Sequence, residues 1–63
     1  MDKYVIISDD NKFWNENKKQ WVNIFSMVSP LEFEEAQRIA NDLESEHEIS
    51  IKSFSEELRK YSI

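Results

Sequence analysis

Apolar residues between positions 29 and 44 recur at steps of three and four, the spacing of one face of an α-helix. Polar and charged residues fill the positions between them. The apolar face consists of Phe33, Ala36, Ile39, Ala40 and Leu43. We therefore predict that the main element of the chain is an amphipathic helix over Ser29–Glu44.

The start of this helix carries several recognisable signals. Ser29 and Glu32 have the spacing of a capping box, in which each side chain accepts a hydrogen bond from the backbone N–H of the other residue. Pro30 then occupies the first helical position, where its missing N–H costs nothing. Val28 and Phe33 are placed to form a hydrophobic staple that fixes how the chain enters the helix.

Short runs of β-branched and aromatic residues on both sides of the helix indicate strands. Lys3–Ser8 contains the unbroken run YVII, and Lys12–Asn15 returns after a turn at Asp9–Asn11, so that the two runs form a hairpin. Glu48–Phe54 alternates apolar and polar residues and is predicted to return beside the first strand. Trp21–Met27 fits either a third short strand or an extended segment that leads into the helix.

Both faces of the first strand are apolar, because successive residues of Tyr4–Ile7 point to opposite sides. A single helix covers only one of these faces. The C-terminal segment or a partner chain must therefore cover the other. Phe13 and Trp14 are neighbours in the second strand, so we expect one of them to face the core and the other to face outward.

The C-terminal residues predict a second, short helix. Ser53 and Glu56 have the spacing of another capping box, and one helical stripe then carries Phe54, Leu58 and Tyr61. A helix of about two turns is not stable alone, so this stripe must pack on its own chain or on another. Because so short a chain has a small core, we expect a homodimer with the stripe as its interface.

Together these elements predict a single α+β domain over residues 1–63. It contains a small antiparallel sheet, made of a β-hairpin and a return strand, with one main amphipathic helix and a short C-terminal helix. No signal peptide and no apolar run of about 18 residues is present, so we expect a cytoplasmic protein.

The composition argues against cofactors and metals. The chain has no Cys and no Gly, which excludes disulfides, thiolate metal sites and glycine-rich phosphate loops. His47 stands among carboxylates but lacks the further ligands of a zinc site, so a solvated turn is the favoured interpretation. Asp9–Asn11 lacks the Gly and the distal Glu of a calcium loop. We predict no bound cofactor.

Catalysis is not expected either. There is no Cys nucleophile, the single His lies in an acidic segment, and no Ser stands in a nucleophile elbow. A chain of 63 residues also leaves little volume to enclose a substrate. We therefore predict no catalytic residues and a protein that acts by binding.

The net charge is −5, and the acidity is concentrated in one segment. Residues 32–48 contain one basic residue, Arg38, and the acids Glu32, Glu34, Glu35, Asp42, Glu44, Glu46 and Glu48. This sign disfavours direct nucleic-acid binding, which depends on Lys and Arg. Carboxylates near a helix C-terminus also oppose the helix dipole, so they bring no local stability. A cluster of exposed carboxylates does, however, attract a basic protein surface.

The expected partner-binding residues combine this charge with aromatic anchors. Trp and Tyr are frequent hot-spot residues, and the chain has eight aromatic residues, more than one helix and a small sheet are expected to bury. Whichever Trp is exposed would be the anchor. The predicted set is Trp14, Trp21, Glu34, Glu35, Asp42, Glu44, Glu46 and Glu48.

The order YVIIS, DDNKFW, KKQW, then the helix EEAQRIA and a final strand, resembles small hairpin–helix–strand proteins encoded in phages and prophages of low-GC bacteria. Trp14, Trp21 and Glu35-Ala36 carry this resemblance over most of the chain. It implies a bacterial host cytoplasm and an inhibitor of a host defence protein, of the anti-CRISPR type, that masks a basic nucleic-acid-binding surface. The alternative is a structural or assembly protein that forms a homo-oligomer without an inhibitory role.

Overall fold

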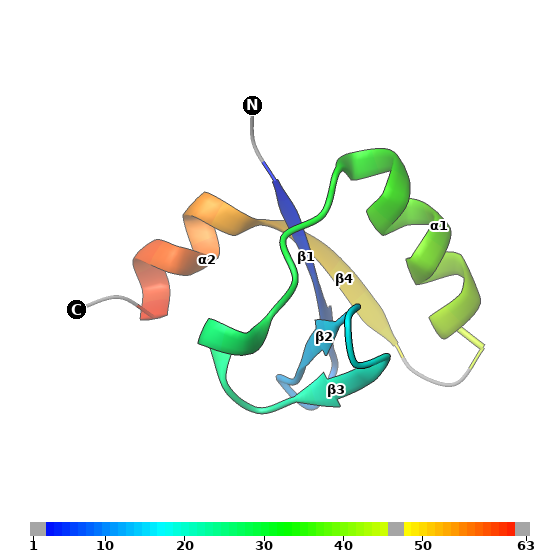
Figure 1. The fold of residues 1–63 in the computed structure, drawn as a ribbon, viewed down its shortest axis with the longest axis horizontal. Coiled ribbons are helices and arrows are strands. Elements are labelled where there is room, and N and C mark those ends of the chain that lie inside the picture. Colours follow the sequence, from blue (N-terminus) through cyan, green and yellow to red (C-terminus); the bar gives the residue numbers. More distant parts are fainter. Residues whose placement is uncertain (1–2, 46–47, 62–63) are drawn as a thin grey trace.

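A four-stranded antiparallel sheet forms the centre of the molecule in the computed structural model, which describes residues 3–45 and 48–61 (Figure 1). The strands lie in the order β3-β2-β1-β4. Their bounds are β1 Tyr4–Ser8, β2 Phe13–Asn15, β3 Gln20–Val22 and β4 Ile49–Ser53. The predicted hairpin and the predicted return strand beside β1 are both confirmed.

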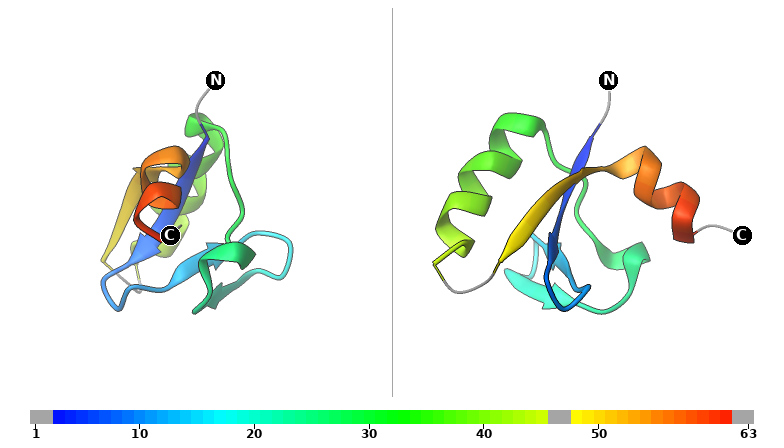
Figure 2. Two further views of the ribbon diagram at one scale, coloured as in Figure 1. Left: turned by 90° about the vertical axis from the view of Figure 1, so that its left-hand side faces the viewer. Right: turned by 180° about the vertical axis from the view of Figure 1, so that it is seen from behind.

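Helices stand on both sides of the β1–β4 pair (Figures 1 and 2). Helix α1 (Phe33–Leu43) lies on one side, whereas α2 (Phe54–Tyr61) lies on the other. A short 3-10 helix, η1 (Phe25–Met27), lies before α1 in the chain, so the segment predicted as a strand or an extended stretch contains the end of β3 and then η1. The α+β class is confirmed. Within the described ranges, no helix is long and apolar enough to cross a membrane.

Two residues with a left-handed backbone replace glycine in the turns. Asn11 has a φ of 63° and closes the β1–β2 turn, where its N–H donates to the carbonyl of Ser8 at 3.0 Å. The hydroxyl of Ser8 also accepts from the N–H of Lys12 at 3.1 Å. Lys19 has a φ of 54° in the β2–β3 turn. Asn tolerates this conformation better than other non-glycine residues, so the predicted Asp9–Asn11 turn forms without glycine.

The predicted start of the main helix is wrong. Helix α1 begins at Phe33, and its N-cap residue Glu32 makes no side-chain capping bond. Ser29 instead accepts from the N–H of Glu16 at 2.8 Å, while Leu31 and Tyr4 exchange two backbone hydrogen bonds of 2.7 and 2.8 Å. The extended conformation of Ser29–Glu32 is more stable than a helical turn with a capping box, because it forms more hydrogen bonds and also buries Leu31.

The predicted hydrophobic staple is likewise absent. Val28 packs into the core on the α2 side of the sheet, with Val5, Ile7 and Phe13. Phe33 is exposed on α1, and its ring makes an edge contact with Tyr4, with 5.0 Å between the centroids. The two residues therefore belong to different faces of the sheet.

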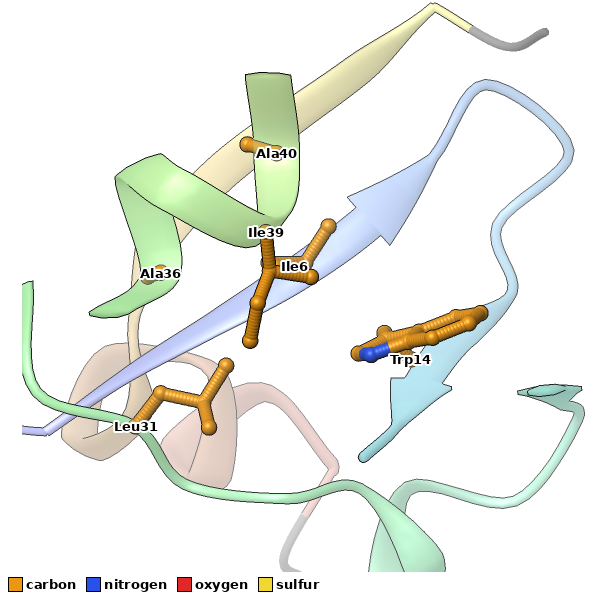
Figure 3. Close-up of a cluster of buried hydrophobic side chains, with 6 residues drawn as sticks. All are labelled: Ile6, Trp14, Leu31, Ala36, Ile39 and Ala40. Carbon is orange, nitrogen blue, oxygen red and sulfur yellow. The ribbon is translucent and has the colours of Figure 1, made fainter. Parts of the chain in front are cut away.

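Each face of the sheet has its own apolar cluster. The cluster under α1 consists of Ile6, Trp14, Leu31, Ala36, Ile39 and Ala40 (Figure 3). The cluster on the opposite face consists of Val5, Ile7, Phe13 and Val28, with Phe25 and Phe54 packed against it. Strand β1 contributes to both clusters, as its two apolar faces predict, and the C-terminal segment helps to cover the second face.

Candidate protein-binding surfaces

The outward surface of α1 is acidic. Glu34 and Asp42 are exposed on it, Glu44 is exposed at its C-cap, and Glu35 is half-buried. Arg38 is the one basic residue of the helix and lies 3.9 Å from Glu35. In the part of the chain that the structure describes, Glu34, Asp42 and Glu44 form no ion pair. Their charge therefore faces solvent without a counter-ion among the described residues.

Other acids of the predicted set lie around this helix. Glu48 is exposed just before β4. Glu46 and His47 lie outside the described residues. Glu32 is not part of the open acidic surface, since it pairs with Lys3, and the hydrogen bond from Lys3 lowers the pKa of the Glu32 carboxyl. The structure thus gathers Glu34, Glu35, Asp42 and Glu44 on one helix, with Glu48 on the segment that follows it.

The two tryptophans differ in exposure. Trp14 is only 8% exposed, and its Nε1–H donates to Glu16 at 2.9 Å. Trp21 is half-buried and packs edge-to-face on Trp14, with 5.3 Å between ring centroids. The expectation that Phe13 or Trp14 faces outward is wrong, because helices cover both faces of the sheet and bury both residues. Trp21 is therefore the more accessible of the two tryptophans, at the edge of the α1-side cluster.

Glu16 is held in place by two donors. Lys19 and Trp14 both donate hydrogen bonds to its carboxylate, and these bonds lower the pKa of Glu16. Glu16 and Glu35 line a polar hollow of about 490 Å³ beside the segment from Ser26 to Leu31. Among the described residues, no three His, Cys, Asp or Glu side chains are grouped to hold a metal ion. The Glu16 carboxylate therefore links Trp14 of β2 to Lys19 of the β2–β3 turn.

The predicted stripe on α2 forms one wall of an apolar groove. Phe54 and Tyr61 both stack on Phe25, with centroids 5.5 and 5.1 Å apart, while Leu58 stays exposed. The groove has a volume of about 660 Å³ and runs between α2 and the η1 region. Its lining residues are Ile24, Phe25, Ser26, Val28, Pro30, Phe54, Leu58 and Tyr61.

Sequence reasoning missed the second wall of this groove. The pattern of residues 21–27 predicts a strand or an extended segment for Ile24 and Phe25, and neither element implies a contact with α2. The signal was present in the stripe itself, since a two-turn helix needs a partner element. The element that packs against α2 is η1 of the same chain, whose Phe25 contacts Phe54 and Tyr61.

Comparison with protein-family models, curated proteins and solved structures finds no match to this chain.

Proposed function

We propose that this protein is a non-catalytic inhibitor that binds a protein with a basic surface through the acidic side of α1. The observation that carries the proposal is the set of exposed carboxylates, Glu34, Asp42 and Glu44, without internal ion pairs in the described residues. Asp42 and Glu44 lie at the negative end of the helix dipole, where carboxylates reduce stability. A binding role accounts for a cost that folding does not require.

Charge of this kind acts mainly on the rate of association. Like-signed groups on one surface attract an oppositely charged partner over a distance and raise the association rate, and salt screens this attraction beyond about 8 Å at physiological ionic strength. A basic groove that binds nucleic acid is the natural target. The resemblance of the sequence to phage proteins makes a nucleic-acid-binding host defence protein the first class to test.

Affinity also needs an apolar anchor that loses its water on binding. Trp21 suits this role because it is half-buried at the edge of the cluster under α1, on the same side of the sheet as the acidic helix. Replacing a true hot-spot residue with Ala costs at least about 2 kcal/mol, which is about 30-fold in Kd. Trp21→Ala should thus slow association little and speed dissociation strongly.

The test uses the tagged protein to retain partners from a bacterial lysate at low and high salt, followed by kinetics with the purified partner. Glu34→Gln with Asp42→Asn should lower the association rate at least about tenfold at low salt. The matched control, Asp9→Asn with Asp10→Asn, removes the same charge from exposed residues of the β1–β2 turn. It should change the rate much less.

Two results would refute the proposal. One is an equal association rate for the α1 double variant and the Asp9/Asp10 double variant, since the rate would then depend on net charge and not on the α1 surface. The other is the absence of any specific partner at low salt. Removing Asp42 relieves an unfavourable interaction with the helix dipole, whereas removing Glu34 from the first turn loses a favourable one. The two effects offset each other, so the α1 variant should melt close to the wild type, and a melting curve checks that unfolding does not imitate lost binding.

A further inference from the structure

Strand β4 forms one outer edge of the sheet, because the strand order places it next to β1 alone. It pairs with β1 in an unbroken register over all its residues, so this edge is regular. The left panel of Figure 2 shows β4 at the margin of the sheet, with the described helices over the sheet faces. The other outer strand, β3, has only three residues. Strand β4 is therefore the longer of the two edges at which a further strand can pair.

The backbone groups of β4 point alternately toward β1 and away from it. Just before β4, the carbonyl of Glu48 accepts from the N–H of Asp9 at 2.9 Å, which makes these residues a hydrogen-bonded pair. Such pairs alternate with non-hydrogen-bonded pairs in an antiparallel ladder, so Ile49 and Ile51 belong to non-hydrogen-bonded pairs. The 2.8 Å bond from the Phe54 N–H to β1's side of the ladder fits the same alternation. The N–H and C=O groups of Ile49 and Ile51 therefore point to the outer edge.

The side chains around Ser50 read alike in both directions, except that the charge changes sign. Residues 48–52 have the sequence EISIK. When this segment lies antiparallel to a copy of itself about Ser50, Glu48 lies opposite Lys52, and each Ile lies opposite an Ile. A parallel pair in register would instead place like charges side by side. The segment is thus complementary to its own reverse.

We propose that β4 pairs with β4 of a second copy of this chain, antiparallel and about a two-fold axis at Ser50. The two sheets then join into one continuous sheet. In this register Ile49 faces Ile51 of the second copy, and because the backbone groups of both residues point outward, each such pair exchanges two hydrogen bonds. One strand supplies both sides of the contact, as a two-fold symmetric interface requires. Backbone groups and side chains therefore favour the same register.

Both faces of the joined sheet gain contacts. On the α1 side, Ile49 and Ile51 are half-buried against the cluster that contains Ile6, and the second copy covers their outer sides. On the other side, Glu48 and Lys52 are exposed, and neither forms an ion pair with another described residue. In the dimer they face each other in non-hydrogen-bonded pairs, where side chains come closest. The interface thus combines apolar contacts on one face with two opposite-charge pairs on the other.

Helix α1 leaves room for this pairing. It packs on β1 as well as on β4, so it is set back from the outer edge. The two-fold axis is perpendicular to the sheet, so the α1 helices of both copies lie on the same side of it, with their acidic surfaces still open. Repulsion between these acidic surfaces and the narrow contact area keep the dimer weak. We expect a dissociation constant of about 0.1–1 mM.

The first test is the mass of the protein in solution from micromolar to millimolar concentration, by sedimentation equilibrium. The wild type should pass from the 7.6 kDa monomer toward twice that mass. Leu58→Glu is the control for the apolar groove, since it places a charge on α2 and not on β4. It should dimerise like the wild type.

The second test measures the register by disulfide formation. The chain contains no Cys, so a single introduced thiol can pair only between copies. At the axis, the two residues 50 form a non-hydrogen-bonded pair with Cα atoms about 4.5 Å apart, within the range that a disulfide spans. Ser50→Cys should therefore cross-link at least about tenfold faster than Asn17→Cys, because the dimer holds its two thiols together. Asn17 is the matched control, an exposed residue in the β2–β3 turn.

The third test exchanges charges across the axis. Glu48→Lys alone and Lys52→Glu alone should each weaken self-association about tenfold, because each places like charges opposite one another twice. An equal mixture of the two variants should form a heterodimer of nearly wild-type affinity, since both facing pairs are then of opposite sign. Asp10→Lys is the control for net charge, because Asp10 is exposed in the β1–β2 turn. Circular dichroism checks that each variant is folded.

Four outcomes would overturn the proposal. A wild type that stays monomeric at millimolar concentration would show that β4 does not pair with itself. Loss of the dimer in Leu58→Glu would assign the interface to the apolar groove. Equal cross-linking of Ser50→Cys and Asn17→Cys would exclude the two-fold axis at Ser50. A mixture of charge variants that associates no better than its components would exclude the facing of Glu48 and Lys52.

Discussion

Replacing Ser29 with Ala tests the most unexpected local feature of the fold, the extended path before α1. The Ser29 hydroxyl accepts from the Glu16 N–H at 2.8 Å and so ties the start of the β2–β3 turn to the chain before the helix. Its removal leaves a partly buried N–H without its acceptor. Such a group costs about 1–3 kcal/mol, and partial access to water places this case near 1.5 kcal/mol.

The expected loss is large for a small domain. A chain of this size has a stability of about 3–9 kcal/mol, so the substitution removes a substantial fraction. The melting midpoint should fall by about 6–12 °C. Ser45→Ala is the control, because its exposed hydroxyl donates only to the Asp42 carbonyl at 3.3 Å. That variant should melt within a few degrees of the wild type.

Amide hydrogen exchange identifies which residues lose protection. We expect Ser29→Ala to accelerate exchange at the Glu16 amide and to leave the first turn of α1 unchanged. Accelerated exchange in the first turn, starting at Phe33, with an unchanged Glu16 amide would mean that Ser29 acts as a helix cap. That outcome would refute the reasoning, even if the melting midpoint fell as expected.

Two further predictions concern the turns. Glu16→Gln removes a carboxylate whose pKa is lowered by hydrogen bonds from Lys19 and Trp14, so the variant should be less stable than the wild type above about pH 5. This difference in the free energy of unfolding should vanish as the pH falls through the lowered pKa of Glu16. Urea unfolding at several pH values measures it. A difference that persists in acid would contradict the ion-pair explanation. Asn11→Ala should cost about 1 kcal/mol because Asn11 has a φ of 63°, whereas Asn11→Gly should be nearly neutral, and equal urea midpoints for the two variants would count against left-handed strain.

The types of the main elements follow from local patterns. The YVII run, the Asp9–Asn11 turn and the alternation in residues 48–54 each predict an element that is present at nearly those bounds. The two apolar faces of β1 also predict that something covers both sides of the sheet. These features depend on side-chain periodicity, which is set by the backbone geometry of each element and is independent of distant contacts.

The errors arise where distant backbone groups compete with local signals. Ser29 and Glu32 have capping-box spacing, but Leu31 lies opposite Tyr4, and its two backbone hydrogen bonds to β1 outweigh the cap. The approach of η1 to α2 depends on the same tertiary path, so the groove was not predictable from spacing. Trp14 has no sequence mark that distinguishes its buried position from the half-buried position of Trp21.

The place of β1 between β2 and β4 has a consequence for how the protein folds. Tyr4 pairs with Ser53, near the opposite end of the described chain, and β1 also supplies residues to both apolar clusters. The cluster under α1 includes Ile49 and Ile51 of β4, and the opposite cluster includes Phe54 at the start of α2, so both need residues from the C-terminal part of the described chain. The β1–β2 hairpin, in contrast, is a local structure. Long-range pairing of this kind slows folding relative to helical proteins of similar size. During synthesis, we therefore expect the β1–β4 side of the sheet to stay unpaired until β4 has left the ribosome.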